Sequence, residues 1–202
     1  MQFNQVLDKY RNISFSQRDK GDRFERLMQR YLLTDPKYSS VIEKVWLWTE
    51  FPHKDDLGGA DTGIDLVAYT STAEYWAIQC KCYQETSVID KAAVDSFLST
   101  SGRKFRDDKG KLISFAHRIW ISTTNHWGPN ASEAIKNQQP AVTRINLYDL
   151  QQAPVDWKKL EEGVHGELSR TQKKELRKHQ QDAVELTHKH FKKSDRGKLI
   201  MA

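Results

Sequence analysis

The sequence predicts an α/β fold, in which a mixed central β-sheet is flanked by helices and followed by a C-terminal helical extension. Hydrophobic residues make up 38% and aromatic residues 10% of the 202-residue chain, which favours a folded core. Apolar residues recur at helical spacing in some segments and form short β-rich runs in others. These segments follow one another as helix, strand, strand, strand, helix, strand, helix and strand. That alternation is typical of α/β domains.

Helices are expected before the first strand. Residues 3–15 favour a short helix, and residues 17–34 predict a longer one with a single apolar face. That face is made by Phe24, Leu27, Met28, Tyr31 and Leu32. Glu25 lies at the border of the face, where a solvated surface carboxylate is the plain interpretation. Asp35-Pro36 ends the helix, because a residue that precedes proline avoids helical dihedral angles.

Three strands are predicted next. The first lies within residues 41–51, which contain an apolar and aromatic run. A polar, glycine-containing loop over residues 53–61 leads to two further strands, over residues 64–69 and 75–83. A short polar turn joins these two, so they are expected to pair as neighbours.

Helices and strands alternate in the rest of the predicted domain. Ser87 is the expected N-cap of its first helix, with Asp90 three residues later. The expected segments are a helix over 88–100, a charged loop over 101–111, a strand over 118–123, a helix over 130–138 and a strand over 144–147. We therefore expect the α/β domain to occupy residues 1–150.

The C-terminal quarter differs from the predicted domain. Residues 151–168 lack a clear period and contain a proline and two glycines, which predicts a linker. A basic helix is expected over residues 169–191, followed by an apolar strand over 198–202. One face of that helix carries Leu176, Gln180, Ala183, Val184, Thr187 and Phe191. Gln180 is the polar member of this otherwise apolar face.

Charge and composition exclude several classes of protein. Residues 158–202 hold 12 Lys and Arg against 7 Asp and Glu, whereas the rest of the chain is balanced. This excess is compatible with binding to nucleic acid but does not indicate it by itself, because charged runs are usually solvated faces. No apolar run approaches the roughly 18 residues of a membrane span, and the N-terminus has no apolar signal core. A cytoplasmic protein without a membrane partner is expected. Cys80 and Cys82 share one strand face and cannot sensibly bridge each other, and no second pair completes a zinc site.

Candidate catalytic residues gather on the second and third predicted strands. Alternation along the third strand places Gln79 and Lys81 on one face and Cys80 on the other. With Asp65 they combine a carboxylate, an amide oxygen and an ammonium, which suits Mg²⁺-dependent hydrolysis of a phosphodiester. Asp65 would be the main metal ligand and Gln79 a neutral second one, while Lys81 would orient the attacking water. Glu25 could complete the site. By spacing alone, an ordinary hairpin with polar surface residues is an equally good interpretation.

These residues lie within a resemblance to a nuclease family. GGADTGIDLVAY followed by WAIQCKCY resembles the core of the Mrr-like branch of the PD-(D/E)xK nucleases, where a glycine-flanked D-x-G-x-D precedes a strand. GDRFERLMQRYL resembles the first helix of that family, with its acidic residue at Glu25, and the similarity continues through RIWISTTNHW to RINLYDL. The resemblance covers about residues 17–150. It implies that Asp65 is the catalytic aspartate and that Gln79 replaces the usual glutamate two residues before Lys81. Asp61 is the rival for the catalytic role, but its place in the predicted loop favours a turn residue.

A second resemblance concerns the C-terminal segment. ELRKHQQDAVELTHKHF and then RGKLIMA are similar to the start of superfamily 2 helicase motors, and Gln180 matches their adenine-reading glutamine. The phosphate-binding loop G-x-x-x-x-G-K-[ST] is absent up to Ala202, so residues 169–202 would be the truncated start of a motor without ATP hydrolysis of its own. A plain basic amphipathic helix is the alternative.

The order of nuclease and motor resembles the N-terminal end of Type ISP single-polypeptide restriction–modification enzymes. This resemblance implies double-stranded DNA as a partner and further motor, methyltransferase and target-recognition domains in the same chain. It also implies that ATP and S-adenosylmethionine serve the longer enzyme, while Mg²⁺ serves the nuclease. We therefore expect a Mg²⁺-dependent DNA endonuclease that nicks one strand per active site. Arg103, Lys104 and Arg106 are candidate DNA contacts, with a solvated loop as the equal alternative.

Two alternative functions stay open on the sequence. One is a catalytically inactive nuclease fold that only docks DNA or protein, against which the presence of both Asp65 and Lys81 argues. The other is a repair or junction nuclease of the same superfamily, which the motor-like C-terminal segment disfavours.

Overall fold

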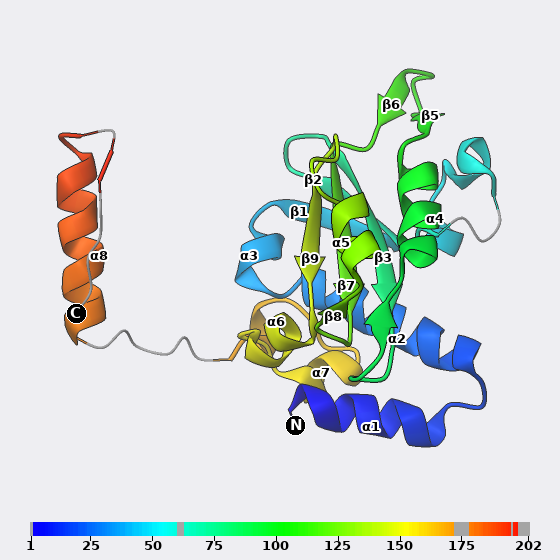
Figure 1. Ribbon diagram of the computed structural model, residues 1–202, viewed down its shortest axis with the longest axis horizontal. Coiled ribbons are helices and arrows are strands. Elements are labelled where there is room, and N and C mark those ends of the chain that lie inside the picture. The colour runs from blue at the N-terminus through cyan, green and yellow to red at the C-terminus, as the bar shows by residue number, and fades with distance from the viewer. Residues whose placement is uncertain (1, 60–62, 172–177, 195, 198–202) are drawn as a thin grey trace. The chain divides into compact units, whose positions relative to one another are not determined.

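The computed structural model describes residues 2–59, 63–171, 178–194 and 196–197 (Figure 1). The chain divides into two compact units, Met1–Thr171 and Gln172–Ala202, and each is described by itself. The first unit contains a five-stranded sheet with helices on both faces.

The central sheet is mixed and has the strand order β1-β2-β3-β7-β9. The first three strands form an antiparallel meander, whereas β3, β7 and β9 run parallel to one another. The strands are β1 (Ile42–Leu47), β2 (Leu66–Thr70), β3 (Tyr75–Lys81), β7 (His117–Ser122) and β9 (Val142–Ile145). This architecture confirms the predicted α/β class with a mixed sheet flanked by helices.

Four helices cover one face of the sheet and enclose the larger core. They are α1 (Phe3–Ile13), α2 (Gln17–Leu32), α6 (Leu147–Gln152) and α7 (Trp157–Glu161). The short α3 (Pro36–Ser39) follows α2, and Asp35 caps it by accepting from the Lys37 amide at 2.9 Å. The predicted apolar face of α2 is fully buried in this core. Burial of that face therefore anchors the N-terminal helices to the sheet.

The opposite face carries a smaller core. Here α4 (Lys91–Ser101) and α5 (Pro129–Ala134) pack on the sheet, with Phe97 and Trp120 in edge-to-face contact at 5.8 Å between ring centroids. The 3₁₀ turns η1 (Trp48–Glu50) and η2 (Lys54–Leu57) contribute Trp48 and Leu57 to it. Alternation along the strands divides the sheet residues between the two cores, as the period of two requires.

Local structure differs from expectation at the start of α4. The helix begins at Lys91, and Asp90 is its cap because its carboxylate accepts from the Ala93 amide at 2.9 Å. The expected cap, Ser87, lies too early because Val88 and Ile89 form β4 (Val88–Ile89), which pairs in parallel with β8 (His126–Trp127). This pairing is between residues distant in the sequence, so a helical period cannot reveal it.

The predicted charged loop over 101–111 is partly a hairpin. β5 (Lys104–Arg106) pairs antiparallel with β6 (Leu112–Ser114). Phe105 is fully buried, although both of its neighbours in β5 are charged. The Phe105 ring packs edge-on against Phe51 at 5.4 Å. One buried aromatic side chain thus holds an otherwise charged hairpin on the smaller core.

Residues 151–168, expected to be a linker, instead pack on the domain. Val155, Trp157 and Leu160 belong to the larger core, and the Trp157 ring stacks on Tyr31 at 5.3 Å and contacts Phe3 at 4.5 Å. The apolar residues lie in helices and turns too short to show a period. The first unit consequently extends to Thr171 rather than residue 150.

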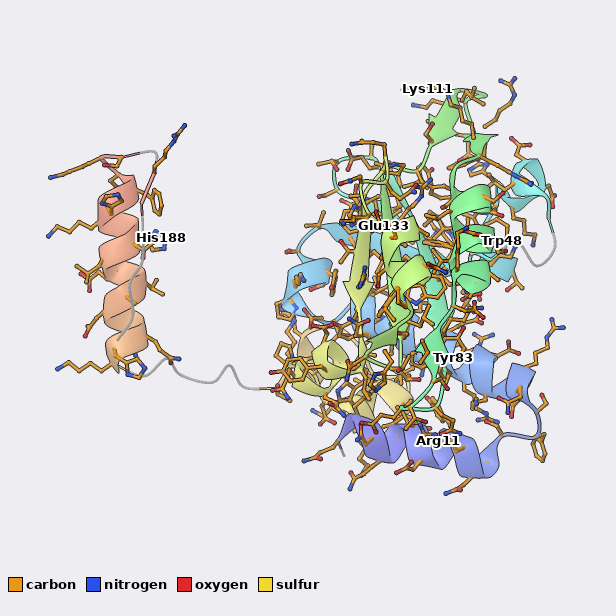
Figure 2. The ribbon with its side chains drawn as sticks, in the orientation of Figure 1. Arg11, Trp48, Tyr83, Lys111, Glu133 and His188 are labelled. Atoms are coloured by element: carbon orange, nitrogen blue, oxygen red, sulfur yellow. The ribbon has the colours of Figure 1, made fainter. Side chains whose placement is uncertain are left out.

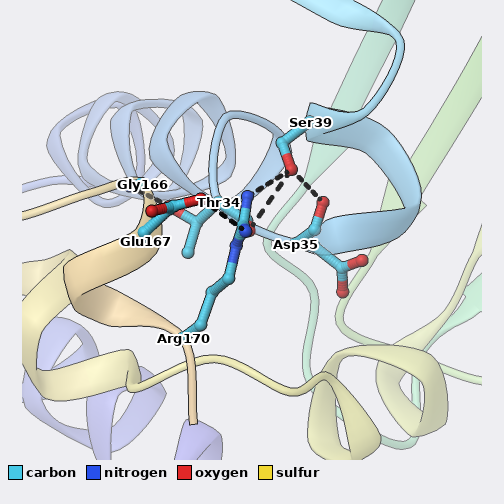
Figure 3. A network of polar contacts seen from close by, with 6 residues as sticks. All are labelled: Thr34, Asp35, Ser39, Gly166, Glu167 and Arg170. Atoms are coloured by element: carbon cyan, nitrogen blue, oxygen red, sulfur yellow. Dashed lines mark hydrogen bonds and ion pairs between the residues drawn. The ribbon is translucent and has the colours of Figure 1, made fainter. Parts of the chain in front are cut away.

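A polar clasp closes the first unit at the corner between α2 and α3 (Figure 3). The Arg170 guanidinium donates to the Thr34 carbonyl at 2.9 Å and to the Ser39 hydroxyl at 3.0 Å. The Gly166 amide, just before η3 (Glu167–Ser169), donates to the Thr34 hydroxyl at 2.8 Å. The end of the first unit is thereby tied to the end of α2.

The described part of the second unit contains α8 (Lys178–Phe191), in which no residue is buried. Thr187 donates its hydroxyl to the Ala183 carbonyl at 2.7 Å within the helix. Leu176 and the strand expected over residues 198–202 lie outside the described residues. None of the helices that the structure describes is long and apolar enough to cross a membrane.

Replacing Trp157 by alanine tests whether residues 151–168 are structural. We expect Trp157→Ala to lower the free energy of unfolding by about 3–5 kcal/mol, because it removes a buried aromatic ring from the larger core. Leu168→Ala, at a side chain that is 76% exposed, is the matched control and should change the value by less than about 0.5 kcal/mol. Urea unfolding followed by tryptophan fluorescence and circular dichroism measures both. Equal stability of the two variants would contradict this packing.

Candidate active site

The backbone of Asp65 is held between two strands. Asp65 directly precedes β2, and its amide donates to the Ile78 carbonyl at 2.9 Å, while its own carbonyl accepts from the Trp48 amide at 2.7 Å. The pairing of Leu66 with Ile78 places Asp65 beside Gln79. The start of β2 and the second half of β3 therefore form one edge of the site.

Gly63 allows the chain to approach this edge closely. Its φ is +78°, and a Cβ built there would lie 3.0 Å from the Ser96 hydroxyl and 3.2 Å from the Phe97 amide nitrogen. A side chain at this position would therefore press against α4 in a strained backbone conformation. This contact therefore requires a glycine at position 63, two residues before Asp65.

The Asp65 carboxylate is oriented by β3. Its Oδ2 atom accepts from the Cys80 backbone amide at 2.7 Å and from the side-chain amide of Gln79. Gln79 is only 1% exposed, so its amide is fixed by packing as well as by this hydrogen bond. Because the amide nitrogen is directed at Asp65, the amide oxygen is turned away from that carboxylate oxygen. Asp65 and Gln79 thus meet as predicted.

Glu25 and Lys81 complete the group. Lys81 is the last residue of β3 and half-buried, while Glu25 is half-buried on α2. Burial, then the negative charges of Asp65 and Asp22, raise the pKa of Glu25 to about 7, against the opposing charges of Lys81 and Arg26. Glu25 therefore lies in the electrostatic field of the other site residues, and it is not the fully solvated carboxylate of the plain interpretation.

The donor set fits a hard divalent cation. Burial, and then the negative charge of Asp65, raises the pKa of Glu25, and a cation held by both carboxylates would offset their repulsion. The Gln79 amide supplies a neutral oxygen. Among the residues that the structure describes, no group of three His, Cys, Asp or Glu could enclose a metal ion. The arrangement suits Mg²⁺, which keeps several waters and needs few protein ligands.

The neighbouring cysteines do not contribute ligands. Cys80 is buried, and desolvation followed by the charges of Asp65 and Glu25 raises the pKa of its thiol well above the usual value. Cys82 is partly buried against the larger core, and burial also raises its pKa. Both thiols are free, as the sequence predicts. Only the backbone amide of Cys80 takes part in the site.

The remaining predicted residues lie elsewhere. The Arg103 guanidinium donates to the Leu57 carbonyl at 3.2 Å and the Arg106 guanidinium to the Gly110 carbonyl at 3.0 Å, so both brace the hairpin and its surroundings. Lys104 is exposed on β5. Gln180 belongs to the second unit, and Asp61 lies outside the described residues.

Three supporting features escape sequence reasoning. The Cys80 amide, the Trp48 amide and the contact of Gly63 with α4 all position Asp65 or its approach. Backbone donors carry no signal of residue type, so no motif could identify the first two. The positive φ of Gly63 is signalled only by the presence of a glycine.

The raised pKa of Glu25 predicts a pH-dependent cost in stability. Below its ordinary pKa of 4.5 the carboxyl is protonated in both folded and unfolded chains. As pH rises towards 7, only the unfolded chain loses this proton, so the folded state becomes relatively less stable. In metal-free buffer, the thermal midpoint of Glu25→Gln should therefore increase relative to that of the original chain as the pH rises from 4.5 to 7.5. Added Mg²⁺ should reduce this increase.

Glu43→Gln, at an exposed glutamate on β1, is the matched control for this measurement. The difference in thermal midpoint between Glu43→Gln and the original chain should stay nearly constant over the same pH range. A pH-independent difference for Glu25→Gln would show that the carboxyl is not desolvated beside another negative charge.

Comparisons with known proteins bear on this site. The chain matches the restriction endonuclease family Mrr_cat_2 over residues 33–167, which include Asp65, Gln79 and Lys81. Glu25 precedes the matched range. None of the curated proteins compared matches the chain.

Three solved structures are similar to the chain. The ATP-dependent Type ISP restriction-modification enzyme LlaBIII bound to DNA is 31% identical, with a TM-score of 0.60, over 97% of this chain and 12% of that one. MspJI restriction endonuclease in complex with a 27-mer oligonucleotide is 18% identical (TM-score 0.42, 73% of this chain and 30% of that one). The DNA modification-dependent restriction endonuclease AspBHI is 14% identical (TM-score 0.44, 80% and 35%).

The chain thus spans only 12% of the length of LlaBIII, although nearly all of it is matched. The family match, by contrast, spans well over half of this chain and contains the strand pair that holds Asp65. It confirms the resemblance to Mrr-like nucleases. The chain belongs to the Mrr_cat_2 family of restriction endonucleases.

Proposed function

We propose that the chain is a Mg²⁺-dependent endonuclease module that hydrolyses the phosphodiester backbone of double-stranded DNA, one strand per active site. The observation that carries this proposal is the placement of Asp65 against Gln79, with the repelling carboxylate of Glu25 and the ammonium of Lys81 around it. The proposed ligands are Asp65, Gln79 and Glu25. A bound Mg²⁺ would polarise the phosphate and lower the pKa of a water molecule.

Each side chain has a distinct proposed task. The Lys81 ammonium orients the attacking water and stabilises the negative charge that develops on the phosphate. Glu25, whose pKa is raised to about 7, would hold a proton in part of the molecules at neutral pH and would have to lose it to serve as a ligand. Asp65 stays oriented throughout by the amides of Gln79 and Cys80.

Gln79 distinguishes this site from one with a glutamate at the same position. As a neutral amide it donates a hydrogen bond to Asp65, which a carboxylate could not do. It fixes the direction of the Asp65 carboxylate while adding no negative charge. We propose that this makes Gln79 both a weak ligand and a positioning residue.

The partners follow from the similarity to a DNA-bound enzyme. LlaBIII is a Type ISP enzyme described as bound to DNA, which supports DNA as the substrate here. We propose that motor, methyltransferase and target-recognition domains belong to the same longer, cytoplasmic protein, with ATP and S-adenosylmethionine as their cofactors. Gln180 would read adenine in that motor. Arg103, Lys104 and Arg106 remain proposed DNA contacts, and all three are exposed.

A catalytically inactive docking fold is the main rival. It would have no need for a half-buried Glu25 beside Asp65, since that arrangement costs stability at neutral pH. A junction or repair nuclease would use the same chemistry and differ only in the shape of the DNA. The two rivals are therefore separated by metal-dependent cleavage and by the choice of substrate.

Alanine at Asp65 tests the proposed chemistry. With Mg²⁺, the original chain should convert supercoiled plasmid to nicked circles, and both EDTA and Asp65→Ala should reduce the rate at least about 100-fold, because the main ligand is removed. Asp95→Ala is the matched control, since that carboxylate pairs with Lys91 on the surface of α4. Nicking that survives EDTA, or that Asp65→Ala supports at the original rate, would overturn the proposal.

A glutamate at position 79 tests the role of the neutral amide. Gln79→Glu would place a carboxylate against Asp65, and two carboxylates in contact cannot both ionise easily. We expect nicking by Gln79→Glu to shift towards higher pH by about one unit or more. The pH profile of the nicking rate at subsaturating Mg²⁺, where a bound cation does not cancel the repulsion, measures this. Gln152→Glu is the control on an exposed glutamine at the end of α6, and an equal shift in it would contradict a specific effect.

A further inference from the structure

Phe15 is exposed in a way that the fold does not require. Its side chain is 96% exposed, more than any other large hydrophobic residue in the described part of the chain. It lies in the turn between α1 and α2, directly before the cap residue Ser16. An apolar residue at this position usually packs on the fourth helical residue, but here that residue is Lys20. Helix initiation therefore leaves the Phe15 ring without a partner.

The turn that presents Phe15 is nevertheless fixed. The Phe15 amide donates to the Asp19 carboxylate at 3.1 Å, and the Asp19 amide donates to the Ser16 hydroxyl at 3.0 Å. These two hydrogen bonds form a reciprocal cap at the start of α2. The aromatic ring thus projects from a defined backbone, which lowers the entropy lost when a ligand packs on it.

Phe15 borders a groove with basic walls. The groove has a volume of about 390 Å³ and is lined by both helices and by Gln84, which follows β3. Arg11 and Lys20 supply its positive charge. Arg11 forms a 2.8 Å ion pair with Asp8, whereas Lys20 pairs with no carboxylate among the described residues. Lys20 is therefore available to an anionic ligand.

The groove lies next to the end of β3, the strand that ends at Lys81. Burial raises the pKa of the Cys82 thiol, while the charges of Lys20 and Arg11 oppose that rise, so both cations are near the residue that follows Lys81. Figure 2 labels Arg11 on α1, and Arg11 lines the same groove as Gln84, which follows β3. Gln84, which lines the groove, lies three residues after Lys81 in the chain.

We propose that this groove holds an unpaired stretch of the DNA strand beside the cleaved bond, with Lys20 and Arg11 on its phosphates and the Phe15 ring stacked on an unpaired base. A cationic groove with an exposed aromatic ring is the arrangement that binds a nucleic-acid strand without reading its sequence. The inference rests on the proposed nuclease function, because it takes DNA as the substrate. It adds a positioning residue, Phe15, that lies outside the family match.

Binding to a gapped DNA tests the stacking contact. The probe is a fluorescein-labelled duplex with a central gap of thymidines, and a second probe carries abasic residues in the gap. All proteins carry Asp65→Ala and are measured in EDTA by fluorescence anisotropy, so cleavage does not interfere. Phe15→Ala should weaken binding to the thymidine probe about tenfold and to the abasic probe less than twofold. Phe15→Trp should restore tight binding.

Lys20→Gln tests the phosphate contact in the same assay. It should weaken binding to both probes alike and reduce the slope of log K against log salt by about 0.7–0.9, as expected for one lost phosphate contact. Leu168→Ala and Lys158→Gln are matched controls at exposed positions and should change neither affinity nor slope. Thermal melting of each variant checks that the fold is retained.

The outcomes separate this inference from the proposed function. If the Asp65→Ala protein binds DNA and the added Phe15→Ala change weakens binding to neither probe, the groove does not stack a base and the inference is wrong. The nuclease proposal would still stand. An equal loss on both probes would also exclude base stacking. If the parent protein binds neither probe, DNA as the substrate is contradicted and the inference falls with it.

Discussion

The hydrogen bonds between Asp65 and β3 are the interaction on which the site depends. They exist only because Leu66 pairs with Ile78, which brings Asp65 beside Gln79 and the Cys80 amide. The same register sends Ile78 and Cys80 into the larger core. A slip of one residue would exchange the two faces of the strand between the two cores and remove the donors from Asp65. Core packing and the catalytic arrangement are therefore specified by one register.

The helix α2 connects this strand pair to the rest of the first unit. It buries Leu27 and its apolar neighbours while it presents Glu25 towards Asp65 and Lys81. Its second half is tied down by Arg30, which donates to the Leu160 carbonyl at 2.9 Å, and its end by the Arg170 clasp. The segment that includes α7 thus supports the helix that carries Glu25. This explains physically why the domain does not end where the sheet ends.

Much of this could be predicted from the sequence, because it depends on local periods. Alternation identifies the strands and the shared face of Gln79 and Lys81, and helical spacing identifies α2. The rest depends on contacts between distant segments. The environment of Glu25, the burial of Trp157 and the pairing that moves the cap from Ser87 to Asp90 arise only once the chain has folded. Short helices such as α7 have too few residues to show any period.

The central claim is that Asp65, Gln79 and Glu25 hold a divalent cation. Crystals of the chain soaked in Mn²⁺, which substitutes for Mg²⁺ at oxygen-ligand sites and scatters anomalously, test it most directly. We predict an anomalous difference peak beside the Asp65 carboxylate that is absent from crystals of Asp65→Ala. Peaks only at other positions, or a peak at this position that persists in Asp65→Ala, would contradict the claim.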